Sequence, residues 1–324
     1  MHYWQTEVRI GNRSFGRFIG GPLDGVTDVP FRQVVRSLSP EALLYTEIRH
    51  VHCIAHEIGG VRPLAFDDRE RPLNFQVTAN SLDGIDVAIE KILTRGVDCI
   101  DLNIGCPAKN IVGSGSGSAL MADVPLLEQI LKRIRALSTV PFTVKMRAGF
   151  KEENAVDVAL LCQDCGVDAV ALHPRLRTQR FTGEPDYDLV AEVKKVVSIP
   201  VLVSGGINEY EIAKRVYEQT GCDGFLIGRG MIGRPWILAQ MHAQSLGMVY
   251  AEPTVSQRMI IAERHLDAML SWYGPSGLYA FRKHLAAYMS GFERAGALRA
   301  ALMEEESLAE VKRVLAEVME SNGV

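Results

Sequence analysis

The sequence contains no long apolar run. No window approaches the roughly 18 consecutive uncharged apolar residues that a membrane-spanning helix requires. Its first residues, MHYWQTEVRIGNRSFGRF, are interrupted by charges and lack the apolar stretch of a signal peptide. We therefore expect a cytoplasmic protein that has no membrane partner.

The chain also has few cysteines and a small net charge. The six cysteines in 324 residues are too few for a disulfide framework, which indicates free thiols in a reducing compartment. Lys and Arg number 35 against 39 Asp and Glu, so the chain lacks the basic excess of many DNA-binding proteins. We expect no DNA partner, while a local basic patch for RNA remains open.

What the sequence does contain is a globular composition with a repeated pattern of strand and helix. Hydrophobic residues make up 47% of the chain, enough for a large core and too many for a disordered protein. Eight short apolar runs, each followed by a polar or glycine-rich turn and a helical pattern, predict eight buried parallel strands. The runs are 17–22, 42–47, 73–77, 99–105, 142–146, 169–174, 201–206 and 224–229.

Eight such units favour an α/β fold, a (β/α)8 TIM barrel. A doubly wound open sheet is the alternative, but its glycine-rich turn usually follows the first strand. Here the glycine-rich turns follow the last two strands, where barrels hold phosphate. After Trp236 the pattern is only helical, so we expect residues 1–245 to form a catalytic barrel and residues 246–324 a small all-helical domain.

Polar and glycine residues gather where these strands end. Gly205, Gly206, Gly228 and Arg229 could admit and neutralise a phosphate, aided by the positive end of the helix that follows each turn. One phosphate implies a mononucleotide, and a fixed cation beside its ring would stabilise a reduced flavin. FMN therefore fits this barrel better than NAD, with the ring lined by Gln76, Lys145 and His173.

Cys106 directly follows the fourth predicted strand and precedes the Gly/Ser-rich segment 113–118. A segment without an apolar face favours a thiol in a cleft over a packed structural cysteine. Such a thiol can act as a nucleophile or as a general acid. No dedicated base is evident in the sequence, so proton donation opposite a hydride is the better interpretation.

Two further clusters carry ligand-type residues. His52 and His56 would share one helix face, but no partner set is evident near them, so we predict a packed or solvated helix and no metal. Cys162 and Cys165 form a lone CxxC near a helix end, without the second pair that zinc needs. We expect these two cysteines to pack in the core.

The ordered motifs together resemble the tRNA-dihydrouridine synthase family, over roughly residues 19–288. The family's layout, an FMN-holding barrel followed by a small helical domain, agrees with the strand count. The resemblance rests on GPLDGVTDVPFR (21–32), NFQVTAN (74–80), DLNIGCPAK (101–109), GSALM (117–121), TVKMRAG (143–149), LHPRLRTQRFTG (172–183), SGGI (204–207), IGRGMIGRPW (227–236) and RKHLAAY (282–288).

The resemblance implies that NADPH reduces FMN, that the flavin delivers hydride to C6 of a tRNA uridine, and that Cys106 protonates C5. A uracil stacked in tRNA must be flipped out to reach such a site. The implied flavin-binding residues are Pro22, Gln76, Lys145, His173, Gly205, Gly206, Gly228 and Arg229. We expect Leu23, Asp24 and Ser204, which adjoin them in the sequence, to bind the flavin as well, although Leu23 and Ser204 differ from the residues common in the family. The implied substrate-binding residues are Asn103, Lys145 and Arg177 at the base, with Arg282, Lys283 and His284 gripping the tRNA body.

The chain departs from the family pattern in the loop after Cys106. Val112–Ser116 stands where relatives often carry basic residues, which predicts a more mobile loop and weaker tRNA binding. Two alternatives therefore stay open: a barrel flavoprotein that acts on a free pyrimidine, similar to dihydroorotate dehydrogenases, and a tRNA-binding protein with weak catalysis. We expect a monomer whose tRNA binding rests on a local basic surface and falls steeply with added salt.

Overall fold

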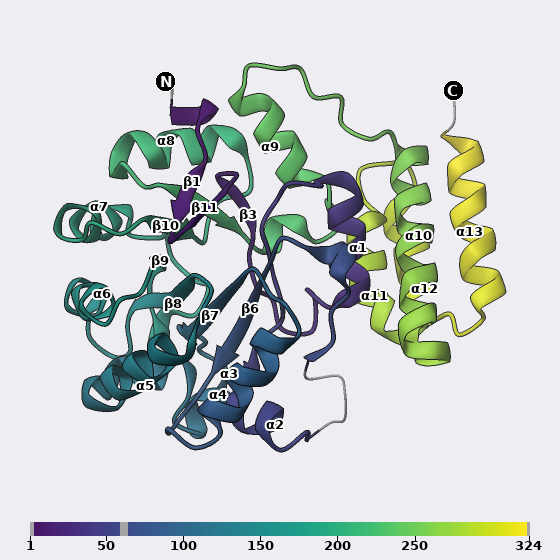
Figure 1. The fold of residues 1–324 in the computed structure, drawn as a ribbon. Coiled ribbons are helices and arrows are strands. Elements are labelled where there is room, and N and C mark those ends of the chain that lie inside the picture. The colour runs from purple at the N-terminus through teal and green to yellow at the C-terminus, as the bar shows by residue number, and fades with distance from the viewer. Residues whose placement is uncertain (1–2, 59–63, 323–324) are drawn as a thin grey trace.

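The computed structural model describes residues 3–58 and 64–322, and its centre is a closed barrel of parallel strands (Figure 1). The eight predicted strands are all present, and every residue of six of them is buried, as expected for strands covered on both faces. The TIM-barrel prediction is therefore confirmed. The barrel strands are β3 (Phe18–Gly20), β4 (Leu44–Tyr45), β6 (Leu73–Thr78), β7 (Cys99–Ile104), β8 (Phe142–Gly149), β9 (Ala169–Leu176), β10 (Val201–Ser204) and β11 (Gly224–Ile227).

The barrel closes between β4 and β6, where Leu44 pairs with Leu73. A short extra strand, β5 (Arg49–His50), pairs with the far end of β6. An antiparallel hairpin of β1 (Val8–Ile10) and β2 (Arg13–Phe15), which the sequence analysis did not predict, packs its apolar side chains against the amino ends of the barrel strands. The hairpin thus covers the end of the barrel opposite the carboxyl ends of the strands.

Helices surround the barrel and are defined by local capping. The Asp123 side chain accepts a hydrogen bond from the Leu126 amide and so begins α5, which has a proline in its first turn. Cys162 and Cys165 are buried in the core between barrel and helices, as predicted. The surrounding helices are α1 (Val29–Leu38), α2 (Val51–Ala55), α3 (Ile85–Thr94), α4 (Lys109–Gly113), α5 (Val124–Leu137), α6 (Ala155–Asp164), α7 (Tyr187–Val196), α8 (Tyr210–Thr220) and α9 (Ile237–Ser245).

The carboxy-terminal part of the chain is helical and has an apolar core of its own. These helices are α10 (Val255–Tyr273), α11 (Gly277–Tyr288), α12 (Ala295–Glu304) and α13 (Leu308–Ser321). Their core includes Leu266, Phe281 and Leu315, and Val34 of α1 joins it. The helices therefore pack against α1 on one flank of the barrel (Figure 1). Within the described residues, no helix is both long and apolar enough to cross a membrane.

Candidate active site at the barrel mouth

A cavity of about 880 Å³ opens at the carboxyl ends of the barrel strands, where TIM barrels carry their chemistry. The fold brings most of the predicted site residues to its wall, although they come from all around the barrel. The predicted residues that line it are Pro22, Leu23, Asp24, Gln76, Asn103, Cys106, Lys145, His173, Ser204, Gly205, Gly206, Gly228 and Arg229. Arg177, Arg282 and Lys283 do not line it.

Cations dominate this cavity. Lys145, Arg147 and Arg229 line it, and the Arg175 guanidinium lies behind His173. Burial, and then the adjacent Arg147, lowers the pKa of Lys145 to about 8, while burial lowers the pKa of Arg147 to about 10. Within residues 3–58 and 64–322, no carboxylate lies within ion-pair distance of these four cations. Asp101 offsets part of the Lys145 charge from beyond ion-pair distance, and the remaining positive charge in this partly buried cleft favours an anionic ligand.

His173 is a neutral side chain of defined tautomer. The Arg175 Nη1 atom lies 3.0 Å from His173 Nε2, and a guanidinium can only donate. Nε2 must therefore accept, which leaves the ring proton on Nδ1. Burial, and then the positive charge of Lys145 and its neighbours, lowers the pKa of His173 to about 2. At neutral pH His173 thus adds a hydrogen-bonding group to the cavity without adding charge.

The turn after β10 has a backbone that only glycine accommodates. Gly205 has φ +94° and Gly206 has φ +81°, in the left-handed region. A Cβ on Gly205 would lie 2.5 Å from the His173 ring, and a Cβ on Gly206 would lie 2.5 Å from the Tyr187 hydroxyl oxygen. The two glycines therefore let this turn pack directly against His173 and Tyr187 at the cavity wall.

The turn after β11 differs from the sequence expectation. A helix was expected directly after the GRG sequence, but Arg229–Met231 forms a single 3-10 turn and α9 begins only at Ile237. The positive end of a helix is therefore not supplied there. Arg229 itself is exposed, and its guanidinium lies 4.9 Å from the centroid of the Phe181 ring.

A chain of hydrogen bonds connects the barrel interior to Cys106. Asn103 Oδ1 accepts from the backbone amides of Gly105 at 3.0 Å and Cys106 at 2.8 Å. Asn103 Nδ2 donates to Gln76 Oε1 at 3.0 Å, and Gln76 Nε2 donates to Asp101 Oδ2 at 2.8 Å. Because each amide has one donor end and one acceptor end, the orientation of each fixes the next. Burial raises the pKa of Asp101 to about 7.

The segment after Cys106 begins with a short helix whose residues are exposed or partly exposed and ends in buried residues, and the predicted mobility of Val112–Ser116 stays a prediction. Residues 109–113 form the short helix α4, and the Asn80 side chain donates to the Ser114 carbonyl at 2.7 Å. Ser116 and Ser118 are buried, and the Ser118 hydroxyl donates to the Cys106 carbonyl at 2.9 Å. Small side chains are present here because the segment lies close to the barrel.

Arg180 and Phe181 line the cavity, although the sequence analysis singled out Arg177 of the same segment. The Arg177 guanidinium lies over the Phe150 ring, 4.9 Å from its centroid, outside the cavity wall. The Arg180 carbonyl accepts from Arg147 Nη1 at 2.8 Å, which ties this segment to the cavity. Arg177, Arg180 and Phe181 all belong to the LHPRLRTQRFTG motif, which therefore reaches the cavity through Arg180 and Phe181.

The expected basic cluster on α11 is divided among different environments. His284 is fully buried, so the prediction that it grips a partner is wrong. The Arg282 side chain is partly buried and donates to the Glu305 carbonyl at 2.9 Å, with Tyr279 beneath its guanidinium. Lys283 is exposed and donates to the Gly25 carbonyl in the loop between β3 and α1, beside the mouth.

Together, the closed barrel and its cationic, glycine-lined mouth define a TIM-barrel protein with a site for an anionic ligand. The chain belongs to the dihydrouridine synthase family, because that family's model, "Dihydrouridine synthase (Dus)", matches residues 19–322. The probable tRNA-dihydrouridine synthase 1 of Synechocystis sp. is 35% identical over 96% of this chain and 89% of its own length. tRNA-dihydrouridine synthase B of Pseudomonas aeruginosa is 35% identical over 90% of each chain. A probable tRNA-dihydrouridine synthase of Rickettsia conorii is 32% identical over 97% of this chain and 98% of its own length.

A solved structure shares the barrel. Histamine dehydrogenase from Rhizobium sp. 4-9 aligns with a TM-score of 0.56 at 14% identity, over 82% of this chain. This chain spans about half, 51%, of the length of that protein. At this identity the likeness concerns the fold alone.

Proposed function

We propose that this protein is a tRNA-dihydrouridine synthase that reduces the C5=C6 double bond of specific uridines in tRNA, with FMN as cofactor and NADPH as reductant. Membership of the dihydrouridine synthase family supports the reaction, and the relatives bearing the synthase name align over 90 to 97% of this chain. A hydride is added to C6 and a proton to C5, so the double bond is lost and NADPH is oxidised.

The excess of cations at the mouth is the observation that carries this proposal. Gly205 and Gly206 line the cavity with backbone and no side chain, so a phosphate could approach their backbone, and Arg175 and Arg229 would neutralise it. Gln76, Lys145 and His173 lie on three different strands around the same cavity and would flank a flat ring. These residues fit FMN, which when bound supplies hydride transfer.

Cys106 would supply the proton in this reaction. It lines the cavity, and its backbone amide is held by Asn103 Oδ1 at 2.8 Å. The Arg147 Nε atom donates to the Gly105 carbonyl at 2.8 Å, which fixes the adjoining backbone. A thiol on a backbone held at the wall could meet a base that is flipped into the mouth, where Asn103 and Lys145, which line the same cavity, could contact the polar edge of the base.

The two parts of the chain would then have different roles. Residues 1–245 would hold FMN and carry out the reduction, and residues 246–324 would contact the tRNA body. Lys283 lies beside the mouth, and Arg294 and Arg299 are exposed on the same helical part. Arg177 and Arg282, away from the cavity wall, would act on the tRNA outside it. We further propose a cytoplasmic monomer.

The direct test is reconstitution with FMN and unmodified tRNA. Purified protein should show a flavin spectrum and release FMN on denaturation, NADPH should bleach that spectrum faster than NADH, and mass spectrometry should detect dihydrouridine in the tRNA. Cys106→Ala should keep the flavin, its reduction by NADPH and tRNA binding, and lose about 100-fold or more in dihydrouridine formation. Cys53→Ala, a partly exposed thiol on α2, is the matched control and should retain turnover.

Other outcomes would point elsewhere. A colourless protein that FMN cannot reconstitute would overturn the proposal. Reduction of free uridine as fast as tRNA would indicate a small pyrimidine substrate, and tRNA binding without flavin reduction would indicate an RNA-binding protein.

A further inference from the structure

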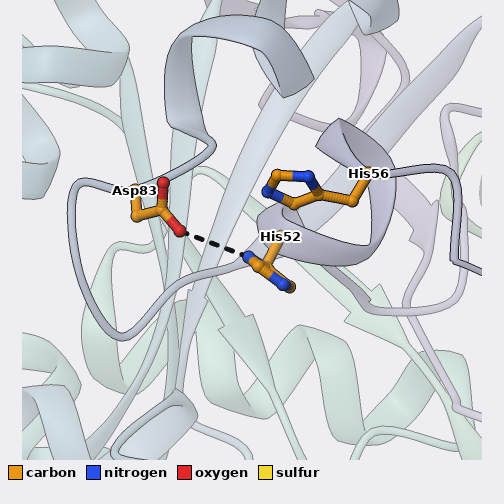
Figure 2. Close-up of side chains that lie close together, drawn as sticks. All are labelled: His52, His56 and Asp83. Carbon is orange, nitrogen blue, oxygen red and sulfur yellow. Dashed lines mark hydrogen bonds and ion pairs between the residues drawn. The ribbon is translucent and has the colours of Figure 1, made fainter.

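Two histidines and an aspartate from separate elements meet on the surface of the barrel, away from the residues that line the mouth. His52 lies on α2 and His56 immediately follows it, while Asp83 lies in the loop before α3 (Figure 2). One ligand atom from each of the three lies within 4.8 Å of the other two. His52 Nδ1 is 3.3 Å from Asp83 Oδ2, and the two imidazole centroids are 4.2 Å apart. All three side chains are exposed and therefore accessible from solvent.

The helix that carries the two histidines is short but is fastened at both ends. At its start the His50 Nδ1 atom accepts from the His52 amide, and His50 Nε2 lies 3.2 Å from the Ser116 hydroxyl. At its end the Lys91 ammonium donates to the Ala55 carbonyl at 3.1 Å and to the Glu57 carboxylate at 2.8 Å. The backbone positions of His52 and His56 are therefore set by contacts that do not involve their own imidazoles.

The loop that carries Asp83 is held equally close to that helix. Gly84 has φ +76°, and a Cβ at this position would lie 3.1 Å from the Ala55 Cβ and 3.4 Å from the His52 Cα. Only a glycine allows the loop to approach α2 this closely with this backbone. The approach places the Asp83 carboxylate opposite His52, although the two residues lie far apart in the sequence.

We propose that His52, His56 and Asp83 form a binding site for a divalent transition-metal ion such as Zn²⁺. Imidazole nitrogen and carboxylate oxygen are suitable ligands for such ions. Two ligands of a tetrahedral zinc, each about 2.0–2.1 Å from the metal, are about 3.3 Å apart, which is the His52 to Asp83 separation. The exposed His56 side chain needs only a rotamer change to complete a three-ligand site with one position left for water.

The sequence alone showed two histidines on one helix face and no third ligand, and the fold supplies Asp83. An ion bound here would join α2 to the loop before α3. His50 at the start of α2 contacts Ser116, in the segment that follows Cys106. By restricting the motion of α2, the ion would also restrict the motion of this segment. This proposal does not depend on the proposed function, because it concerns none of the residues that line the mouth.

The test is a Zn²⁺ titration of the tag-free, full-length holoprotein by calorimetry, repeated with Ni²⁺. Wild type should bind one Zn²⁺ per chain at this site, and His52→Ala, His56→Ala and Asp83→Asn should each weaken that binding by more than about tenfold, since loss of even an outer-shell partner can have that effect. His242→Ala is the matched control because this exposed histidine lies on α9, outside the cluster. It should bind as wild type does.

Two further variants separate the proposed ligands from other causes. Cys53→Ser removes the neighbouring thiol on α2 and should leave Zn²⁺ affinity unchanged. Gly84→Ala retains all three ligands but pushes the loop from α2, and should weaken binding while far-UV circular dichroism stays as in wild type. Zn²⁺ affinity that is unaffected by loss of His52, His56 or Asp83, or that His242→Ala reduces equally, would overturn the proposal.

Discussion

Gln76 and Asp101 are direct partners across the barrel wall, in register on the neighbouring parallel strands β6 and β7. Both are buried, and the Gln76 amide donates to Asp101 Oδ2 at 2.8 Å while the Thr143 hydroxyl donates to Asp101 Oδ1 at 2.6 Å. Asp101 thus accepts from both sides and fixes which end of the Gln76 amide points toward Asn103. A residue outside the cavity wall thereby controls the orientation of two that line it.

Asp101→Asn should therefore disturb the site from a distance. An asparagine at position 101 turns an NH2 donor toward either Gln76 or Thr143. If the Gln76 amide flips to accept from this donor, its own NH2 group faces the NH2 group of Asn103, and the hydrogen bond between Asn103 and Gln76 is lost. We expect a loss of about 1–3 kcal/mol in the free energy of unfolding, from unsatisfied buried polar groups, and a severalfold loss of dihydrouridine formation. Denaturant titration and tRNA mass spectrometry measure the two effects.

Thr143→Val is the control for this change. It also removes a hydrogen bond to Asp101 but leaves the contact from Gln76 in place. Thr143→Val should lower the free energy of unfolding by a similar amount and form more dihydrouridine than Asp101→Asn. Equal turnover in the two variants would show that the amide orientation does not matter.

Replacing Gly205 should remove flavin binding through a specific clash. In Gly205→Ala the new Cβ meets the His173 ring at 2.5 Å and the backbone is strained at φ +94°. Gly221→Ala is strained in the same way, at φ +65°, but meets nothing within 4 Å and lies at the end of α8. Both should lose about 1 kcal/mol of stability through backbone strain, Gly205→Ala should lose more because of the clash, and only Gly205→Ala should lose FMN, as measured by absorbance per chain after gel filtration. Loss of FMN from both variants would contradict this explanation.

Two histidines that are buried without charge in the helical part should make a stabilising contribution that is lost as the pH falls below about 6.5. His265 and His284 are fully buried with their ring centroids 4.4 Å apart. His265 lies beside the Tyr288 hydroxyl, and the His284 ring stacks on the Phe31 ring. The positive charge of Lys283 acts on both histidines. Burial, and then Lys283, lowers the pKa of His284 to about 3, and burial lowers the pKa of His265 well below its usual value.

Between pH 6.5 and 3 the unfolded chain therefore binds protons at these two histidines that the folded chain does not, so their contribution to the free energy of unfolding falls as the pH falls. Each histidine contributes up to about 1.4 kcal/mol per pH unit in this window. Denaturant titrations from pH 7.5 to 5 should show a shallower slope for His284→Gln than for wild type. His242→Gln, on the exposed face of α9, should keep the wild-type slope. An unchanged slope for His284→Gln would show that this residue is not the source.

Lys283 should contribute to tRNA binding through its charge. It is exposed beside the mouth, where its ammonium contacts the Gly25 carbonyl. Lys283→Ala should weaken tRNA binding and reduce by about 1 the slope of log affinity against log salt concentration, because one phosphate contact is lost. Filter binding at several salt concentrations measures this slope. Lys312→Ala on α13, where the lysine pairs with Asp267 instead, should leave it unchanged, and the same loss in both variants would count against a local contact.

Much of this molecule was predictable from local pattern. The spacing of apolar runs and turns gave the barrel, because parallel strands buried on both faces read as continuous apolar segments. The same pattern placed Cys106 and Gly205 at strand ends, and these ends meet at one mouth in a closed barrel. Residues at strand ends were thus assigned to the cavity correctly without knowledge of their contacts.

Other features depend on contacts between distant segments, which no local pattern contains. His284 is buried because α11 packs beneath Phe31 of α1, although the neighbouring Arg282 and Lys283 suggested a surface cluster. The choice between Arg177 and Arg180 depended on how one turn after β9 folds back over the mouth. Asp83 reaches His52 because Gly84 lets the loop before α3 lie directly against α2. The sequence by itself determined the barrel and the residues at its strand ends, and the tertiary structure decided which polar side chains face the cavity, the core or each other.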